Sequence, residues 1–321
     1  MSLDIVRTSV KVLFDFSKKL IFLSTDEYDN FITLPDGFEY RLDYLGDSPG
    51  NKGGHSVVLR LLSDEDEAKI IKICPYYTEE TNSRFHNLRR RFQREIIALQ
   101  KANSSSSQRI IRFEQTGKII ISNKTFLYYV MEFADNDLAN YLDEEGITTQ
   151  QRILICQDLA RGIKELHSLN IYHRDIKHDN MLMCSNQCKI ADLGLVSFRD
   201  DDAREELGER IGAFGWESPE VMSKYYAERL AKKKFDKRYK PNQASIIDDK
   251  SDVFQLGKLF WLIFTGQVPV GQIDYDDLVE IREPTLFTLI YKMLLQNKLK
   301  RSDIDQVIKQ LLPISKKYGV V

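Results

Sequence analysis

Apolar residues follow two different periods along the chain, and the change of period predicts a strand-rich first part and a helical second part. In the first part, alternating positions and short apolar runs lie between glycine, proline and serine clusters, a pattern typical of strands. One helical stretch, residues 88–99, interrupts these strands. The predicted strands cover residues 38–42, 68–73, 109–118 and 125–132.

The second part has the helical period. Residues 149–169 carry apolar positions three and four apart, which predicts an amphipathic helix. Residues 259–264 are apolar on every side, as expected of a helix that is buried all round. Short strands are predicted between these helices, at residues 181–182 and 189–190. The stripe of the first helix comprises Ile153, Cys156, Leu159, Ile163 and Leu166.

The first 36 residues precede this organisation, and their apolar positions predict one or two amphipathic helices, or a helix and a strand. A Pro-Asp-Gly turn at residues 35–37 separates them from the rest. We interpret the segment as an extension packed against the body; a docking or regulatory segment is the alternative. The expected division is an extension at 1–36, a first lobe at 37–134 and a second lobe at 135–321. The apolar positions of the extension are Val6, Val10, Leu13, Phe14 and Ile21.

The composition is that of an ordinary globular protein. It has 321 residues, 42% hydrophobic and 29% charged, so it is long enough for a large core. Its net charge of −2 argues against a general attraction to nucleic acid or to a membrane surface. No apolar run approaches the roughly 20 residues of a membrane span. Four cysteines are too few for a disulfide framework, which favours a cytoplasmic location.

One polar stretch carries distinctive chemistry: residues 173–180, His-Arg-Asp-Ile-Lys-His-Asp-Asn, followed by Asp-Leu-Gly at residues 192–194. It places an acid, a lysine and an amide within six positions, and a second acid follows the next short strand. Such groups suit a site that holds metal-bound phosphates beside a hydroxyl nucleophile. The pattern H-R-D-x-K-x-x-N followed by D-x-G resembles the catalytic and magnesium-binding loops of eukaryotic-type protein kinases, in their Ser/Thr-like form.

Two charged residues of the first part would complete such a site. Lys72 lies on the predicted strand 68–73, on the face opposite Ile71, where an unpaired cation would be costly. Glu95 lies on the apolar stripe of the helical stretch and is the expected partner. In kinases such a pair positions the α- and β-phosphates of ATP. Lys69 is a weaker candidate for the pair, and a surface lysine on an edge strand is the alternative for Lys72.

The resemblance also implies a nucleotide site. Residues 51–58 match the glycine-rich kinase loop, with Gly53 as its middle glycine. Asn51 and Ser56 replace the outer glycines, so a plain glycine-rich hairpin turn is the alternative. The end of the last predicted strand corresponds to the hinge that binds adenine, with Met131 as gatekeeper. The residues implied in nucleotide binding are Gly53, Gly54, Ser56, Val58, Lys72, Met131, Glu132, Phe133, Ala134 and Asp137.

The second part carries further kinase-like motifs. Ser-Pro-Glu at residues 218–220 resembles the end marker A-P-E, and residues 251–257 resemble the D-x-W-x-x-G start of a buried central helix. Arg301 lies in a final helical stretch, where the family has an arginine paired with the glutamate of the end marker. The resemblance covers roughly residues 38–312. It implies a two-lobed α+β kinase fold, with an antiparallel-sheet N-lobe that has one key helix and a mainly helical C-lobe.

The resemblance assigns a role to each of these residues. Asp175 orients the substrate hydroxyl and accepts its proton, and Lys177 steadies the γ-phosphate. Asn180 and Asp192 hold Mg²⁺. The expected cofactors are therefore ATP and Mg²⁺, and the expected activity is phosphorylation of Ser or Thr in a protein substrate. The implied catalytic residues are Asp175, Lys177, Asn180, Lys72 and Glu95, and the implied metal ligands are Asn180 and Asp192.

One departure from the family leaves other functions open. Ala213 stands where Ser/Thr kinases have a threonine that bonds the catalytic aspartate. A catalytically weak pseudokinase, acting as a scaffold or a nucleotide-sensing module, is therefore the alternative. A small-molecule phosphotransferase is a third interpretation, which has no need for Lys177.

The segment after Asp192 lacks the usual phosphorylation switch, because no Ser, Thr or Tyr lies between Ser197 and Ser218. We hypothesise that one of its carboxylates pairs with Arg174 and does constitutively what a phosphate does elsewhere. A solvated acidic loop is the alternative. The carboxylates are those of Asp200, Asp201, Asp202, Glu205, Glu206 and Glu209.

Residues 228–240 form a strongly basic run in a segment longer than the family usually has. Such a run is typical of a solvated helical insertion. The alternative is a docking surface for an acidic partner, either a protein or a nucleic acid.

Overall fold

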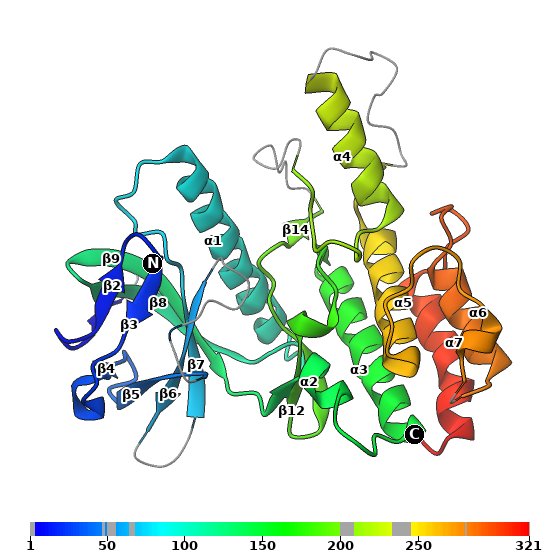
Figure 1. Cartoon of the computed structure of the whole chain (residues 1–321), viewed down its shortest axis with the longest axis horizontal. Coiled ribbons are helices and arrows are strands. Elements are labelled where there is room, and N and C mark those ends of the chain that lie inside the picture. The colour runs from blue at the N-terminus through cyan, green and yellow to red at the C-terminus, as the bar shows by residue number, and fades with distance from the viewer. Residues whose placement is uncertain are drawn as a thin grey trace. The chain divides into compact units, whose positions relative to one another are not determined.

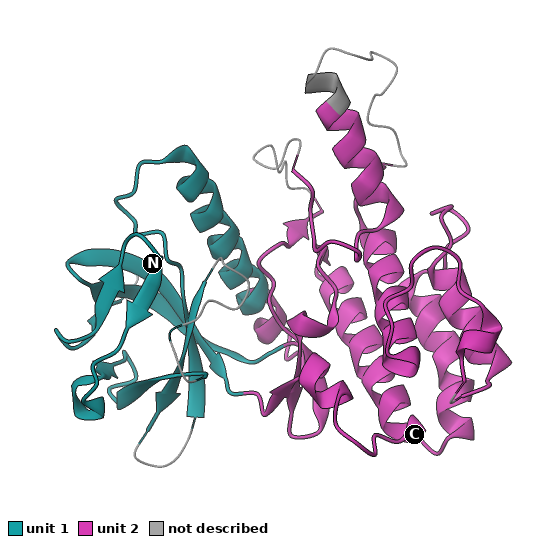
Figure 2. Ribbon diagram, in the orientation of Figure 1, with its two compact units in different colours: residues 1–100, 111–133 teal, residues 101–110, 134–321 magenta. Residues whose placement is uncertain are grey.

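The computed structural model describes residues 4–46, 49, 56–63, 68–199, 209–232, 245–279 and 281–320. The chain divides into two compact units (Figure 2). The first comprises Met1–Gln100 and Ile111–Phe133, and the second comprises Lys101–Ile110 and Ala134–Val321. The main division thus falls between Phe133 and Ala134, within the predicted hinge.

Within the described residues of the first unit, seven strands form one sheet in the order β1-β8-β9-β7-β6-β5-β4 (Figure 1). Neighbouring strands are antiparallel except for β1 and β8, which are parallel. The two edge strands meet at a bridge between Thr8 and Ile32, so the sheet curves toward a closed barrel. The strands are β1 (Ile5–Arg7), β4 (Phe31–Thr33), β5 (Glu39–Tyr44), β6 (Val57–Leu62), β7 (Ala68–Ile73), β8 (Phe113–Ile121) and β9 (Lys124–Glu132).

The expectation of helices in the first 36 residues is wrong. Their described part forms β1, β4, a small hairpin and the short 3-10 helix η1 (Glu27–Asp29). The Asp15 carboxylate explains the hairpin, because it accepts hydrogen bonds from the backbone N–H groups of Ser17 and Lys18 and so turns the chain where a helix would have continued. The hairpin strands are β2 (Leu13–Asp15) and β3 (Leu20–Phe22).

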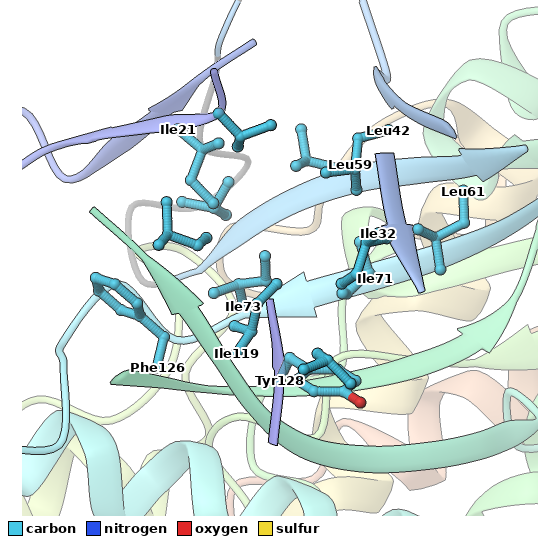
Figure 3. Close-up of a cluster of buried hydrophobic side chains, with 14 of the residues drawn as sticks. Ile21, Ile32, Leu42, Leu59, Leu61, Ile71, Ile73, Ile119, Phe126 and Tyr128 are labelled. Atoms are coloured by element: carbon cyan, nitrogen blue, oxygen red, sulfur yellow. The ribbon is translucent and has the colours of Figure 1, made fainter. Parts of the chain in front are cut away.

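One apolar cluster fills the inner face of the sheet, and Figure 3 shows its side chains gathered between strands that are distant in sequence. Alternate residues of each strand point into it, as the period of two requires. The extension supplies a third of this cluster and is therefore packed into the core. Its contributions are Val6, Val12, Phe14, Ile21, Ile32 and Leu34.

The key helix of the first part, α1 (Ser83–Ser104), is longer than the predicted stretch. It begins after Asn82, whose side-chain oxygen accepts a hydrogen bond from the N–H of Arg84, as an N-terminal cap does. Its last residues, from Lys101 onward, belong to the second unit.

The second unit is mainly helical, as predicted. Helix α5 is buried on all sides, and helix α3 presents its predicted apolar stripe to the interior. The described part of the chain contains no helix that is both long and apolar enough to cross a membrane. The helices are α2 (Leu138–Leu142), α3 (Thr149–Ser168), α4 (Pro219–Lys232), α5 (Asp249–Thr265), α6 (Pro284–Met293) and α7 (Ile304–Lys317). The short elements are β10 (Asn136–Asp137), β11 (Ile171–Tyr172), η2 (His178–Asn180), β12 (Met181–Cys184), β13 (Gln187–Ile190), β14 (Ser197–Phe198) and η5 (Tyr275–Asp277).

Arg301 is not part of the final helix, which corrects the sequence-based placement. Asp303 caps α7, so the helix begins at Ile304, three residues further on, and Arg301 lies in the turn before it. The predicted pair with Glu220 is nevertheless present: two guanidinium nitrogens lie 2.9 and 3.1 Å from the two carboxylate oxygens. Both side chains are buried, so this bidentate pair joins the end of the 218–220 motif to the last turn before α7.

We expect the extension to be essential for the stability of the first unit. Phe14→Ala removes a buried ring and should lower the free energy of unfolding by about 3–5 kcal/mol. The neighbouring Leu13 is more than half exposed, so Leu13→Ala is the control, with an expected change below about 0.5 kcal/mol. Urea unfolding of both variants measures this, and equal effects would contradict the packing described above.

Candidate active site

The sheet of the first unit has a second face, opposite the apolar cluster, and Lys72 projects from it. Val58 on β6 and Tyr129 on β9 lie directly across from Lys72 on the two neighbouring strands. Met131 lies one step further along β9, opposite Ile70. Cross-strand neighbours share a face, so Val58, Lys72 and Met131, all predicted for nucleotide binding, are gathered on one surface of the sheet.

The predicted ion pair between Lys72 and Glu95 is present. Lys72 Nζ lies 2.8 Å from Glu95 Oε1, and the two side chains are 10% and 2% exposed. Tyr129 also donates a hydrogen bond to Glu95 Oε1, at 2.8 Å. Its ring packs beside that of Phe92, the residue one turn before Glu95 on α1. Burial makes each of these charges costly alone, so the pair fixes α1 against the sheet.

Lys69, the competing lysine, is used elsewhere. Its ammonium lies 2.9 Å from Glu114 Oε2 and donates to the Tyr40 hydroxyl at 3.1 Å. Burial opposes the charged form, but the hydrogen bonds to Glu114 and Tyr40 outweigh it and raise the pKa of Lys69. Lys69 therefore stays charged at one end of the inner face, away from the surface that carries Lys72.

Only part of the predicted nucleotide-binding set can be placed. Gly53 and Gly54 lie outside the described residues, while Ser56 is buried just before β6. At the hinge, the N–H of Glu132 donates to the Arg112 carbonyl and its carboxylate accepts from the Arg112 N–H, which ends β9 firmly. Phe133 and Ala134 follow β9 and are half-buried. Asp137 caps α2 through a hydrogen bond from the N–H of Asn140.

In the second unit, residues 173–180 form a loop, here called the HRD loop, between β11 and β12. The Asp252 carboxylate on α5 accepts hydrogen bonds from the N–H groups of His173 and Arg174, both at 2.8 Å. Gln255, one turn later, accepts from the N–H of Ile176 and donates to the Arg174 carbonyl. These two buried side chains impose the shape of the loop, including a left-handed φ of 67° at Arg174.

The Asp175 carboxylate is held by donors on both of its oxygens. Asn180 Nδ2 donates to Asp175 Oδ2 and to the Asp175 carbonyl, both at 2.8 Å. The backbone N–H of Ala213 donates to Oδ1 at 3.1 Å. Lys177 Nζ lies 3.9 Å from Oδ2. The structure thus brings together the three HRD-loop residues that the sequence assigned to catalysis.

The bond from Ala213 lies at the position of the missing threonine. A main-chain N–H supplies the donor that the family takes from a side-chain hydroxyl. The preceding Gly212 makes this geometry accessible, because it has a φ of +89°. A Cβ there would also lie 3.1 Å from the Arg174 carbonyl oxygen. No residue type signals a main-chain bond, so the sequence could not have revealed this donor. The one related signal in the sequence is the glycine at 212, which allows the backbone conformation that the bond requires.

Asp192 follows β13 with a left-handed φ of 48°, and its side chain is exposed. The N–H of the preceding Ala191 donates to the Asn180 carbonyl at 2.9 Å. This hydrogen bond places the backbone of Asp192 next to that of Asn180, the other predicted metal ligand. Asn180 uses its side-chain nitrogen on Asp175, so its amide oxygen is the group left for a cation.

This donor set fits a magnesium ion that is bound partly by the protein and partly by phosphate oxygens. Among the described residues, no group of three or more His, Cys, Asp or Glu side chains could hold a metal by itself. An amide oxygen and one carboxylate are too few for a closed protein site, but Mg²⁺ characteristically completes its shell with phosphate oxygens and waters.

Two predictions fall largely outside the described residues. Arg174 is buried, and its Nε donates to the Leu195 carbonyl at 2.6 Å. Of the six carboxylates proposed to pair with it, only Glu209 belongs to the described part of the chain, so that pairing stays a prediction. The basic run 228–240 starts on α4 and continues beyond the described residues after Lys232, so its docking role also stays a prediction.

Comparison with known proteins identifies the family. The family model described as protein kinase domain matches residues 50–317, so the chain belongs to the protein kinase family. Membership in this family implies the use of ATP and a divalent metal. The first 49 residues, with β1 to β5, lie outside the match.

Individual relatives are distant. The chain is 25% identical over 303 residues to calmodulin-binding receptor-like cytoplasmic kinase 3 of Arabidopsis thaliana, covering 83% of this chain and 53% of that protein. It is 24% identical over 286 residues to the serine/threonine/tyrosine-protein kinase HT1 of the same plant, covering 82% and 65%. It is 26% identical over 201 residues to the sensor for unfolded proteins in the ER ire1 of Schizosaccharomyces pombe, covering 57% and 18%. The chain spans less than two thirds of each of these relatives.

We expect strong energetic coupling between Lys72 and Glu95. Lys72→Met leaves the buried Glu95 carboxylate without its cation, and Glu95→Leu leaves the buried Lys72 ammonium without its anion. Each variant should lower the free energy of unfolding by about 3–5 kcal/mol. The double variant should cost less than the sum, by about 1–3 kcal/mol. A double-mutant cycle by urea unfolding measures this coupling.

The control cycle uses Arg41 and Glu27, which are separated by the same 2.8 Å but are 43% and 60% exposed. Their coupling should stay below about 1 kcal/mol, because water screens the pair. Equal coupling in the two cycles would show that burial does not strengthen the Lys72–Glu95 pair.

Proposed function

We propose that the chain is an ATP- and Mg²⁺-dependent protein kinase that phosphorylates Ser or Thr residues of a protein substrate. The observation that carries the proposal is the orientation of the Asp175 carboxylate, which Asn180 and the Ala213 N–H hold from two sides. A scaffold has no need for a carboxylate fixed in this way, whereas phosphoryl transfer depends on positioning.

The residues of the HRD loop have distinct tasks in this proposal. Each Asp175 oxygen has a lone pair beyond the one used by its donor, so the carboxylate can accept a hydrogen bond from a substrate hydroxyl and then its proton. The Lys177 ammonium, close to that carboxylate, balances the negative charge of a transferring phosphoryl group. Asn180 and Asp192 contribute an amide oxygen and a carboxylate to the metal. Mg²⁺, when bound, neutralises charge on the phosphate oxygens.

Residues of the first unit serve the nucleotide. Glu95 keeps Lys72 fixed on the surface that also carries Val58 and Met131. From there the Lys72 ammonium can bind the α- and β-phosphates. The backbone of Glu132 to Ala134 is proposed to bind adenine.

The proposal includes activity without phosphorylation between residues 197 and 218, where no acceptor residue is available. It also includes Ser/Thr preference, supported by the lysine at position 177. Tyrosine is a second acceptor to be tested, since one relative is named a serine/threonine/tyrosine kinase. A cytoplasmic location is supported by the four free cysteines, because reduced thiols are the rule in that compartment.

The competing function is a pseudokinase that acts as a scaffold or nucleotide sensor. The altered glycine loop, with Asn51 and Ser56 in place of glycines, favours it. Incorporation of labelled phosphate from ATP, with mass-spectrometric mapping of modified residues, separates the two functions. The same experiment reports the acceptor residue type.

Asp192→Ala should abolish phosphate incorporation, because it removes the carboxylate proposed to hold the metal. The surface variant Asp305→Ala, which breaks only an exposed contact to Lys164, should keep the activity of the unmodified protein. ATP binding without incorporation into any acceptor, by the unmodified protein, would favour the scaffold and reject the enzyme.

The donor at position 213 can be tested by removing its hydrogen. Ala213→Pro eliminates the N–H that holds Asp175 Oδ1 and should lower kcat by about 100-fold, since a misplaced catalytic group costs about that much. The KM for ATP should change little. Ala213→Ser keeps the N–H and is the control, with kcat within about threefold.

Gly212→Ala provides an independent variant. It disfavours the positive φ and crowds the Arg174 carbonyl, so it should lower kcat in the same direction. An Ala213→Pro protein that is folded and has the original kcat would show that this bond is not needed.

A further inference from the structure

The first turn of α1 has one apolar side chain, that of Phe85, and two neighbours hold its ring. The Phe85 ring stacks on that of Tyr76, with centroids 4.9 Å apart and an interplanar angle of 23°. Lys19 Nζ lies 5.1 Å from the centroid of the same ring. Tyr76 is buried shortly after β7, whereas Lys19 belongs to the turn between β2 and β3. The start of α1 is therefore in contact with the hairpin of the extension.

The same ammonium group lies over a second ring. Lys19 Nζ is 5.8 Å from the centroid of Tyr77. The Tyr77 carbonyl accepts a hydrogen bond from Arg89, which lies on α1 one turn after Phe85. The Phe16 ring, also in the hairpin turn, packs edge-on against Tyr77 at 5.9 Å. Because a cation is attracted to the face of each aromatic ring, Lys19 links the hairpin to α1 both directly and through Tyr77.

The hairpin that carries Lys19 is itself fixed to the core. Phe14 on β2 is buried, and its ring lies 4.6 Å from that of Phe126 on β9. The N–H of Phe14 donates to the Ser122 hydroxyl at 3.0 Å. Lys19 has a left-handed φ of 57°, and its N–H donates to the Asp15 carbonyl at 2.8 Å. The hairpin is therefore a fixed support from which the lysine reaches α1.

Glu95 lies on the same helix as these contacts. It follows Phe85 by ten residues, so the two are about 15 Å apart along the axis of α1. Because a continuous helix moves as one body, a first turn that leaves the hairpin carries Glu95 with it. The Lys72–Glu95 contact is 2.8 Å long, and a displacement of about 1 Å would remove it. The other residues of the first turn are polar and exposed, so Phe85 supplies its apolar contact.

We propose that Lys19 is a positioning residue for Glu95: by holding the first turn of α1 against the hairpin, it keeps the Glu95 carboxylate at Lys72. The inference rests on the proposed kinase function and adds how the nucleotide-binding lysine is kept in place. The family match starts at residue 50, so this contact comes from a segment outside the matched domain. The extension then controls ATP binding as well as stabilising the sheet.

The test is the variant Lys19→Met, which keeps an unbranched side chain and removes the cation. Hydrogen–deuterium exchange of residues 83–95 should become about fivefold faster, the factor expected when a cation is lost from two partly exposed rings. Exchange in β8 and β9 should stay as in the unmodified protein. The Kd of fluorescently labelled ATP should rise about two- to fivefold, because less of the protein has α1 in place. The KM for a peptide substrate should not change.

Two further variants of the hairpin are the controls. Lys19→Arg keeps a cation over both rings and should retain the exchange rates and ATP affinity of the unmodified protein. Lys18→Met removes the neighbouring lysine, whose ammonium lies over Phe22 within the hairpin, at 5.7 Å. It should leave the exchange of α1 and the binding of ATP unchanged.

Phe85→Leu removes the same contact from the side of α1 and keeps an apolar side chain. It should speed the exchange of residues 83–95 and weaken ATP binding. Combined with Lys19→Met, it should have an effect smaller than the product of the two single effects, because both changes remove one contact. This variant decides the question if the Lys19→Met protein does not fold.

The outcomes separate this inference from the function on which it rests. Unchanged exchange of α1 in folded Lys19→Met protein, or a rise that extends equally over β8 and β9, would overturn the positioning role. Faster exchange of α1 with unchanged ATP binding would overturn it too. Faster exchange confined to α1, with weaker ATP binding but no phosphate transfer by the unmodified protein, would keep the role of Lys19 and overturn the kinase proposal. Failure of the unmodified protein to bind ATP would overturn both.

Discussion

The second unit depends on one buried carboxylate. Asp252, fully buried on α5, accepts hydrogen bonds from two consecutive backbone N–H groups of the HRD loop, and His167 Nε2 lies 2.9 Å from one of its oxygens. Without these partners the charge would be costly, so carboxylate and loop conformation require each other. The loop can then hold a left-handed Arg174 and present Asp175 to Asn180 and Ala213. Helix α5, most of whose residues are apolar and buried, thus supplies the buried carboxylate around which the HRD loop is arranged.

The first unit is built on a similar coupling between a buried charge and a packed element. Glu95 lies on α1, and Lys72 lies on the outer face of a sheet whose inner face is packed with aliphatic side chains. The extension closes that sheet by covering both edges, with β1 beside β8 and β4 beside β5. Covered edges leave few open backbone groups for other chains to pair with. The segment that lies outside the family match is therefore part of the platform from which Lys72 projects.

The parts predictable from sequence were those in which burial and period constrain the residue. Strand 68–73 was placed correctly because it is a short run rich in isoleucine, a residue that favours strands. The Lys72–Glu95 pair followed because each buried charge needed a partner. The extension was mispredicted because strands of three residues hold too few apolar positions to distinguish a period of two from one of 3.6. Arg301 was assigned its correct partner but the wrong local structure, since helix ends depend on caps that are ambiguous in sequence. The Ala213 donor was beyond reach because it is a main-chain atom.

That last contact bears on how active kinases are recognised from sequence. A motif search that requires a hydroxyl-bearing residue at position 213 would miss this chain, although a donor to Asp175 Oδ1 is present. The hydrogen bond requires a donor atom beside Asp175 Oδ1, and a peptide N–H can supply that donor as well as a side-chain hydroxyl can. When the backbone provides the hydrogen, any residue except proline at position 213 can supply it, and the glycine before it becomes the constrained residue. The absence of a motif residue is therefore evidence of altered chemistry only when the structure also lacks the donor or acceptor atom that this residue would supply.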